Sequence, residues 1–306
     1  MIQFVAIFVL SFFITSLFTP FTIKMSQKLR ILDYPSDPGL KIHEKPMPLL
    51  GGVSLAIGII ASLIATGILF DNSIRAIIGL FSALMIIFLF GLLDDTIDLK
   101  PALRLLGQIC AACVVIFICN ITFNYFPIWY FSIPMTILCL IAFVNAINLL
   151  DGLDGLACGI TMIASVGFFV AFILQGDSLW AAISLALAGV TGAFLLFNFH
   201  PAKIFLGDNG STFLGIYLGV LAVKFVSEPY SLKHLLVPAL ILIVPIIDTS
   251  LAIGRRVLKH RPISSGDRDH YYDKLVKKGY SQKSASIISY VFGILGASAA
   301  VLIILI

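Results

Sequence analysis

A cluster of three carboxylates follows a long apolar run in the first third of the chain. The run ends in Gly91-Leu-Leu-Asp94-Asp95-Thr-Ile-Asp98, so Asp98 comes four residues after Asp94 and three after Asp95. One further helical turn would bring these side chains onto one face. Like charges at that spacing repel each other unless a cation or a proton lies between them. The cluster therefore predicts a cation site, and the alternative is an acidic loop that faces solvent.

A second motif repeats a polar side chain every third residue. Its members are Asn145, Asn148, Asp151 and Asp154. The repeat drifts slowly around one helical face, and its first two members lie in an apolar run, where polar groups are costly and usually functional. Two glycines in the motif break the helix and let the backbone approach a ligand. A contact between helices would explain one asparagine but not four polar residues in register, so we predict a ligand-binding site.

A third polar segment lies directly before another apolar run. It reads Asn198-Phe-His-Pro-Ala-Lys203-Ile-Phe-Leu-Gly-Asp208-Asn209-Gly-Ser-Thr. The N–H groups at the start of a helix favour phosphate, and a carboxylate at the same point can hold a divalent cation against it. Magnesium typically uses one or two protein carboxylates and completes its shell with phosphate oxygens and water. Asp208 is therefore a candidate ligand, with a simple capped turn as the alternative.

The last polar segment, between residues 255 and 284, is the most basic and holds nine of the 20 Lys and Arg residues. Arg261, Arg268 and His270 are candidates to grip a diphosphate, since arginine binds phosphate oxygens in pairs. The alternative for each arginine is a role in membrane orientation or headgroup contact. A helix here would carry Tyr271 and Leu275 on an apolar side suited to a membrane surface.

Two smaller features complete the candidates. Lys45 lies in the first polar segment, where Pro46 and Pro48 hold the chain extended before a pair of glycines that allows close packing. Asp248 lies about two turns inside a late apolar run and needs a partner there.

The apolar runs that position these clusters belong to a membrane protein. Of the 306 residues, 59% are hydrophobic and 12% are charged, whereas soluble domains have about 25% charged residues. A spanning helix needs about 20 apolar residues. We expect an all-α integral membrane protein, a single domain over 1–306, with about ten transmembrane helices. The predicted spans are 2–23, 50–70, 74–93, 102–123, 128–149, 156–174, 179–198, 210–227, 234–254 and 284–306.

The distribution of charge gives the orientation. Seventeen of the 20 Lys and Arg residues fall on the odd-numbered connections, and the exceptions are Arg75, Lys224 and Lys233. The positive-inside rule therefore predicts both termini outside and the odd connections in the cytoplasm. These cytoplasmic loops are approximately 24–49, 91–104, 149–157, 198–211 and 255–284. Thirteen of the 16 acids lie on the same side, and because acids contribute little to topology, their clustering points to a site built from these loops.

Together these motifs resemble the polyprenyl-phosphate N-acetylhexosamine-1-phosphate transferases of glycosyltransferase family 4. The resemblance covers most of the chain and rests on five motifs in the same order. These are the first-loop segment His43 to Gly52, DDxxD from Asp94, NxxNxxDGxDGL from Asn145, FLGDNGS from Phe205 and DRxH from Asp267. With an aspartate at position 98, the chain is similar to the enzymes that use UDP-N-acetylglucosamine, because the enzymes that transfer the muramoyl-pentapeptide usually have lysine there. The last loop departs from the family pattern: Tyr271, Tyr272 and Asp273 stand where members usually carry further histidines.

The resemblance implies a reaction in which a polyprenyl phosphate attacks the β-phosphorus of a UDP-sugar and UMP leaves. UDP-N-acetylglucosamine is the sugar nucleotide expected, and the product would start cell-wall or surface-polysaccharide synthesis at the bacterial cytoplasmic membrane. The expected cofactor is Mg²⁺, with Mn²⁺ as the alternative. The expected partners are the UDP-sugar, the polyprenyl phosphate and membrane lipid, with no nucleic acid; a homodimer stays open.

Within that reaction we expect Asp208 to bind the metal with Asp95 as a second ligand, and Asp94 to contact or deprotonate the lipid phosphate. Two phosphates repel each other, so a cation and preorganised donors should supply most of the acceleration. The residues expected to be catalytic are Asp94, Asp95, Asp151, Asp154 and Asp208. Those expected to bind substrate are Lys45, Asp98, Lys100, Asn145, Asn148, Asn198, Lys203, Asn209, Arg261, Arg268 and His270.

Other functions stay open from the sequence. One is phospho-N-acetylmuramoyl-pentapeptide transfer in peptidoglycan synthesis, and another is ion-coupled secondary transport. A transporter predicts polar residues near the midplane of several spans, whereas here they gather at one face and no internal repeat is evident. A phosphatidyltransferase that uses CDP-activated lipids would carry a DGxxAR-type motif, which the sequence lacks.

Overall fold

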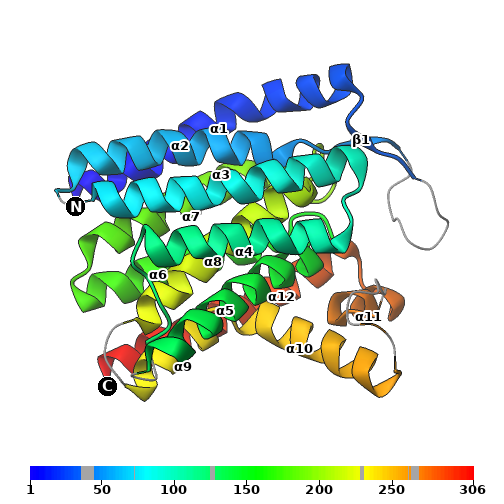
Figure 1. Cartoon of the computed structure of the whole chain (residues 1–306). Helices are drawn as coiled ribbons and strands as arrows, with labels where there is room; N and C mark the ends of the chain where they lie inside the picture. The colour runs from blue at the N-terminus through cyan, green and yellow to red at the C-terminus, as the bar shows by residue number, and fades with distance from the viewer. Residues whose placement is uncertain (36–44, 72, 125–127, 228–230, 261, 263–268) are drawn as a thin grey trace.

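The computed structural model describes the chain except for residues 36–44, 72, 125–127, 228–230, 261 and 263–268. The described residues are almost entirely helical, as predicted (Figure 1). The helices are α1 (Ile2–Leu29), α2 (Gly51–Leu69), α3 (Ile74–Ile97), α4 (Pro101–Phe117), α5 (Trp129–Leu150), α6 (Leu156–Gln175), α7 (Ser178–Asn198), α8 (Gly207–Val226), α9 (Leu232–Ile241), α10 (Ile243–Leu258), α11 (Tyr271–Lys277) and α12 (Gln282–Leu305). A short antiparallel pair, β1 (Leu32–Asp33) with β2 (Met47–Pro48), was not predicted.

Most of these helices are suited to a membrane. Within the described residues, eight are long and apolar enough to span it: α1, α2, α3, α5, α6, α7, α8 and α12. The pair α9 and α10 passes the same test together, and α4 is a shorter apolar helix of 17 residues. The predicted all-α membrane architecture is therefore confirmed. The described residues hold eight or nine helices able to span a membrane where about ten were predicted, because α4 is shorter than the span predicted over 102–123.

The ninth predicted span, 234–254, is not one straight helix. It breaks at Leu242, and α9 and α10 meet at an angle of 82°. Pro245 lies in the first turn of α10, and without an N–H it cannot donate to the carbonyl of Ile241. The proline thus explains why the hydrogen-bond ladder does not continue from α9 into α10.

Helix α8 lies at the centre of the bundle, with 89% of its most apolar stretch buried. It packs against α3 and α5, the helices that end in the first and second polar motifs. The close approach of α3 depends on Gly91, where a Cβ atom would lie 2.6 Å from the Cα of Asn209 and 2.7 Å from the carbonyl oxygen of Asp208. The end of α3 is thereby held against the first turn of α8. Both chain termini lie at the opposite end of the bundle from β1 and α11 (Figure 1).

Candidate active site

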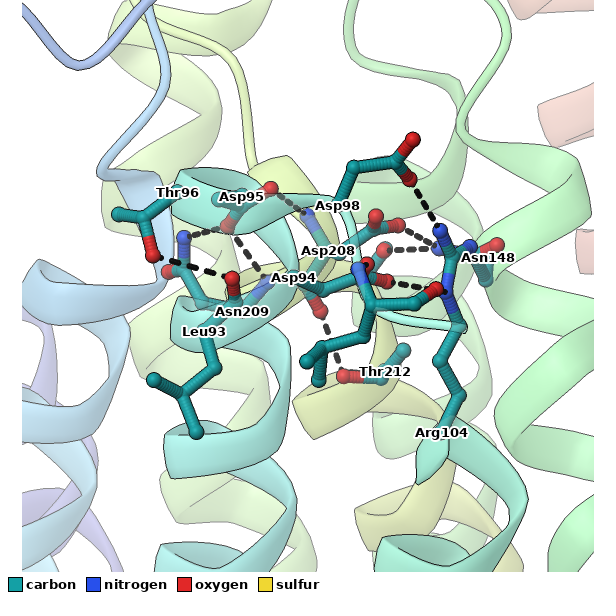
Figure 2. A network of polar contacts seen from close by, with 12 residues as sticks. Leu93, Asp94, Asp95, Thr96, Asp98, Arg104, Asn148, Asp208, Asn209 and Thr212 are labelled. Atoms are coloured by element: carbon teal, nitrogen blue, oxygen red, sulfur yellow. Dashed lines mark hydrogen bonds and ion pairs between the residues drawn. The ribbon is translucent and has the colours of Figure 1, made fainter. Parts of the chain in front are cut away.

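Asp95 joins the end of α3 to the start of α8 (Figure 2). Its Oδ1 accepts the backbone N–H of Asp208 at 2.8 Å, and its Oδ2 accepts the backbone N–H of Asn209 at 2.9 Å as well as the Asn209 side-chain amide. The first N–H groups of a helix have no partner within it. Asp95 therefore caps α8 from a helix more than 100 residues earlier in the chain.

Asp208 lies in the first turn of α8 and is held by α5. The Nδ2 of Asn148 donates to Oδ1 of Asp208 at 2.5 Å and to Oγ of Ser211 at 2.9 Å. The amide of Asn148 thus joins the second predicted motif to the third. Asp95 joins the first motif to the third through its hydrogen bonds to Asp208 and Asn209. The Asp208 carboxylate lies at the positive end of α8, but the N–H groups of Asp208 and Asn209, which were predicted to favour phosphate, donate to Asp95.

A cavity of about 710 Å³ opens beside these contacts, within the size range of ligand sites. Its walls come from the first, third, fifth and seventh connections and from the start of α12. They include Asp33, Lys45, Met47, Leu49, Asp95, Asn148, Asp151, Gly152, Leu153, Asp154, Asn198, His200, Phe205, Gly207, Asp208, Ser211 and Gln282. Five of these residues are carboxylates and one is a lysine. We call this the first cavity, and its lining is strongly acidic.

The connection between α5 and α6 supplies two of these carboxylates. Helix α5 ends at Leu150, so Asp151 and Asp154 lie in the loop and do not continue the helical face of the two asparagines. Burial, and after it the negative charges of Asp208, Asp154 and Asp95, raise the pKa of Asp151 well above its ordinary value. The negative charges of these carboxylates therefore favour the protonated form of Asp151. A bound cation would reduce the repulsion between them.

Asp154 is paired with a histidine that the sequence did not single out. The Nδ1 of His200 donates to Oδ2 of Asp154 at 2.8 Å, and the backbone N–H of Ala202 donates to the same oxygen at 3.0 Å. His200 is half-buried and lines the first cavity. Nearby, Asn198 donates to the carbonyl of Ile204 at 2.9 Å, and its buried Oδ1 finds no hydrogen-bond partner among the described residues. That oxygen can accept a hydrogen bond from a ligand.

The first loop closes the cavity from the other side. The backbone N–H of Phe205 donates to the carbonyl of Pro48 at 2.9 Å, and the N–H groups of Gly51 and Gly52 donate to Phe205 and Leu206 at 3.1 Å each. These bonds pack the segment before Asp208 against the first loop, in agreement with the close packing predicted from the glycine pair. Lys45 of the first loop also lines the cavity.

A second, smaller cavity lies on the other side of Asp208. It measures about 50 Å³ and is lined by Ile87, Phe90, Gly91, Asp94, Arg104, Gln108, Asn145, Asn148, Asp208 and Thr212. Asn148 and Asp208 line both cavities, so they form the partition between them. Asn145 faces this second cavity and donates to Oε1 of Gln108 at 2.9 Å.

Asp94 and Arg104 form the polar wall of the second cavity. The Nε of Arg104 lies 2.7 Å from Oδ2 of Asp94, and its Nη2 lies 2.9 Å from Oδ1 of Asp98 (Figure 2). The other oxygen of Asp94 accepts the N–H of Leu99 at 2.8 Å. Arg104 was not among the predicted residues, although a basic side chain one turn into the helix after an acidic cluster is the kind of signal that identifies such a pair.

Several predicted site residues lie away from both cavities. The Asp98 carboxylate is 95% exposed and pairs with Arg104, Lys100 and Lys203 are exposed, and Asn209 is buried as part of the Asp95 cap. His270 is buried and donates to Oδ2 of Asp248 at 2.7 Å, which supplies the partner that Asp248 was expected to need. Arg261 and Arg268 lie outside the described residues. The apolar side of α11 packs on the protein core, not on a free surface.

Within the described part of the chain, no group of three or more His, Cys, Asp or Glu side chains is placed to hold a metal ion. A ready-made protein cage is not what Mg²⁺ requires, because it binds one or two carboxylates and takes its other ligands from substrate phosphates and water. The donor set of the first cavity, several carboxylate oxygens at the N-terminus of α8, fits that mode of binding.

Comparison of the chain with known proteins gives a matching family model and relatives that match over most of its length. The model of Glycosyl transferase family 4 matches residues 77–226. A Bacillus subtilis (strain 168) protein named a probable undecaprenyl-phosphate N-acetylglucosaminyl 1-phosphate transferase is 34% identical in an alignment of 312 positions. The alignment covers 99% of this chain and 86% of that protein. A decaprenyl-phosphate N-acetylglucosaminephosphotransferase of Mycolicibacterium smegmatis is 31% identical over 85% of this chain and 72% of its own length. A phospho-N-acetylmuramoyl-pentapeptide-transferase of Lactobacillus gasseri is 30% identical over 95% of each chain.

Proposed function

This chain belongs to glycosyl transferase family 4, and we infer that it transfers N-acetylglucosamine 1-phosphate from UDP-N-acetylglucosamine to a polyprenyl phosphate, with release of UMP. The Bacillus subtilis and Mycolicibacterium smegmatis relatives, which are 34% and 31% identical to this chain, carry this activity in their names. The observation that carries the proposal is that Asn148 and Asp208 line both cavities and so separate them. The reaction must bring two phosphate compounds together at one point, and two adjoining cavities allow this.

We assign the UDP-sugar to the first cavity. Its volume of about 710 Å³ suits a nucleotide-sized ligand. The Oδ1 of Asn198 offers a buried acceptor, and Lys45 offers a cation at the rim. The acidic lining would repel a diphosphate unless a cation came with it, so a metal–nucleotide complex is the form in which the donor would enter.

Asp208 is the residue proposed to hold Mg²⁺, with Asp95 as a second contributor. Asp208 suits this role because Asn148 fixes its orientation. The carboxylate of Asp95 already accepts three N–H groups, so its first task is to place Asp208. When bound, the cation would offset the charge that develops on the phosphate oxygens and on the departing UMP. Mn²⁺ is the alternative ion.

We assign the acceptor phosphate to the second cavity. Its apolar wall is formed by Ile87 and Phe90 of spanning helix α3, which suits the start of a lipid chain, and Arg104 supplies a cation beside Asp94. The volume of about 50 Å³ suits one small polar group, since a water molecule takes up about 30 Å³ of the liquid. A phosphate monoester has a second pKa near 6, so much of it is already a dianion at neutral pH. Asp94 would therefore orient the acceptor more than deprotonate it.

The reaction then needs one displacement at the partition. An oxygen of the acceptor phosphate forms a bond to the β-phosphorus of the donor, and the bond from that phosphorus to the bridging oxygen of UMP breaks. Asn148 and Asp208 hold the two phosphates in line, while Asp151 and Asp154 orient the donor. Positioning and charge neutralisation are the main contributions a protein makes to phosphoryl transfer.

The proposal includes an orientation. All the cavity-lining connections lie at the end of the bundle away from the termini, so a cytoplasmic sugar nucleotide reaches the site when both termini are extracytoplasmic. The chain would act as one multi-pass transferase domain in the bacterial cytoplasmic membrane.

Peptidoglycan synthesis is the second candidate, because the Lactobacillus gasseri relative named for pentapeptide transfer covers 95% of this chain. Purified protein with Mg²⁺ and undecaprenyl phosphate should be incubated with UDP-N-acetylglucosamine, UDP-N-acetylgalactosamine or UDP-N-acetylmuramoyl-pentapeptide, and UMP measured. We expect UMP from the first of these. Release from the pentapeptide substrate alone would favour the second candidate, and no UMP from any donor would contradict both.

Replacing Arg104 by Ala tests the assignment of the acceptor. We expect the KM for undecaprenyl phosphate to rise at least tenfold, with the KM for UDP-N-acetylglucosamine changed less than threefold, because the guanidinium lines only the second cavity. Lys24→Ala, which removes an exposed cation from α1, is the control and should change neither constant. A rise confined to the KM for the sugar nucleotide would show that the two cavities are assigned the wrong way round.

A further inference from the structure

Helix α11 reaches the α5–α6 connection through one side chain, Tyr272. Its hydroxyl donates to the carbonyl oxygen of Leu149 at 2.8 Å, and the ring is buried. Leu149 lies in the last turn of α5, where carbonyl groups have no partner from their own helix. Tyr272 therefore supplies a hydrogen bond that the end of α5 lacks.

The ring of Tyr272 also fixes the next part of the loop. A Cβ atom on Gly152 would lie 2.3 Å from the Tyr272 hydroxyl and 2.8 Å from the ring, so the ring packs directly on the Gly152 backbone. Gly152 and Asp151 both line the first cavity. Between them, the hydroxyl and the ring of Tyr272 set the backbone from Leu149 to Gly152.

Tyr272 is itself held by a chain of buried polar contacts. Its ring stacks on the ring of His270, with centroids 5.2 Å apart and planes 5° from parallel. His270 donates to Asp248 of α10, which also accepts the backbone N–H of Tyr271 at 3.3 Å. The His270 and Asp248 side chains are 5% and 1% exposed. A path of direct contacts thus runs from α10 through His270 and Tyr272 to the loop that carries Asp151.

We propose that Tyr272 is a positioning residue for the transfer reaction, acting through the backbone of Leu149 to Gly152 on Asn148 and Asp151. Neither Tyr272 nor His270 lines the first cavity, so the action is indirect. The proposal rests on the proposed function for its kinetic part. It gives a role to Tyr272, one of the three residues at which the last loop departs from the pattern of further histidines.

Tyr272→Phe tests the hydroxyl while it keeps the ring and its stacking. We expect kcat to fall about tenfold with both KM values changed less than threefold, because small displacements of reacting groups slow the chemical step. Tyr290→Phe is a matched control: its hydroxyl donates to the carbonyl of Gly155 at 2.7 Å, at the other end of the same loop. That carbonyl keeps the N–H of Gly159 at 2.8 Å, so kcat should stay within twofold.

A double-mutant cycle tests the ring. Gly152→Ala places a methyl group against Tyr272 and should lower kcat strongly, whereas in a Tyr272→Ala background the same methyl group finds space and should cost much less. Additive effects of the two changes would overturn the proposal, as would a Tyr272→Phe enzyme with wild-type kcat or with only a raised KM.

Hydrogen exchange separates this proposal from the proposed function, because it needs no substrate. The amides of residues 151–154 should exchange faster in Tyr272→Phe than in the wild type and remain unchanged in Tyr290→Phe. Unchanged exchange in Tyr272→Phe would overturn the positioning role even if the wild type proved inactive with every sugar nucleotide. If the wild type proved inactive but Tyr272→Phe still exchanged faster than the wild type, the positioning role would stand and only the proposed function would be contradicted.

Discussion

Replacing Asp208 by Asn is expected to lower kcat at least 100-fold while the protein stays folded. An amide keeps the size and shape of the side chain but removes the charge that would hold a divalent cation at the N-terminus of α8. A 100-fold loss corresponds to about 2.7 kcal/mol of transition-state stabilisation. UMP release at saturating Mg²⁺ gives kcat, and the thermal unfolding temperature reports on the fold.

Asp71→Asn is the matched control for this change. Asp71 is exposed on the connection before α3, at the opposite end of that helix from Asp95, and its loss should leave both kcat and unfolding unchanged. If Asp208→Asn retained more than a tenth of the wild-type activity, Asp208 would not be the metal ligand.

Replacing Asp95 by Asn is expected to abolish activity and also to destabilise the fold. The carboxylate accepts two backbone N–H groups and one side-chain amide, and an asparagine can present only one oxygen to them. Hydrogen bonds to charged groups contribute about 1.5–3 kcal/mol each, so we expect a loss of at least about 2 kcal/mol. A lower unfolding temperature together with a loss of UMP release would establish this double effect.

The two aspartates therefore differ in one readout. Asp208→Asn should lose activity at an unchanged unfolding temperature, and Asp95→Asn should lose both. If Asp95→Asn unfolded like the wild type and recovered activity at high Mg²⁺ concentration, Asp95 would be primarily a metal ligand and its cap of α8 would matter little.

The local parts of this structure could be predicted from the sequence because each depends on neighbouring residues. Runs of apolar residues fix where helices such as α2 and α6 lie, and the glycines after Asp151 do end α5. The three acidic motifs were recognised for the same reason. Asp95, Asp151 and Asp208 line one cavity, whereas Asp94 of the first motif lines the other.

The break between α9 and α10 could not be predicted, because prolines are common in membrane helices and most do not end them. The contacts that assemble the site are also hidden, since they join residues far apart in the chain. Asp95 and Asn209 are 114 positions apart, and Tyr272 and Leu149 are 123 apart. His200 was missed because only its contact with Asp154 reveals its role. Arg104 was missed because a basic residue near a membrane face has a simpler explanation in topology, although its place one turn after an acidic cluster was a usable signal.

The most direct measurement of the central claim follows the two phosphorus atoms of the donor. UDP-N-acetylglucosamine labelled with ³²P in the β-phosphate is incubated with the purified protein, Mg²⁺ and undecaprenyl phosphate, and the lipid is extracted. We predict that the β-label enters the lipid with the sugar, whereas a label in the α-phosphate remains in water-soluble UMP. If the sugar entered the lipid while the β-label stayed with UDP, or if no label entered the lipid, the account of this protein as a sugar-1-phosphate transferase would be contradicted.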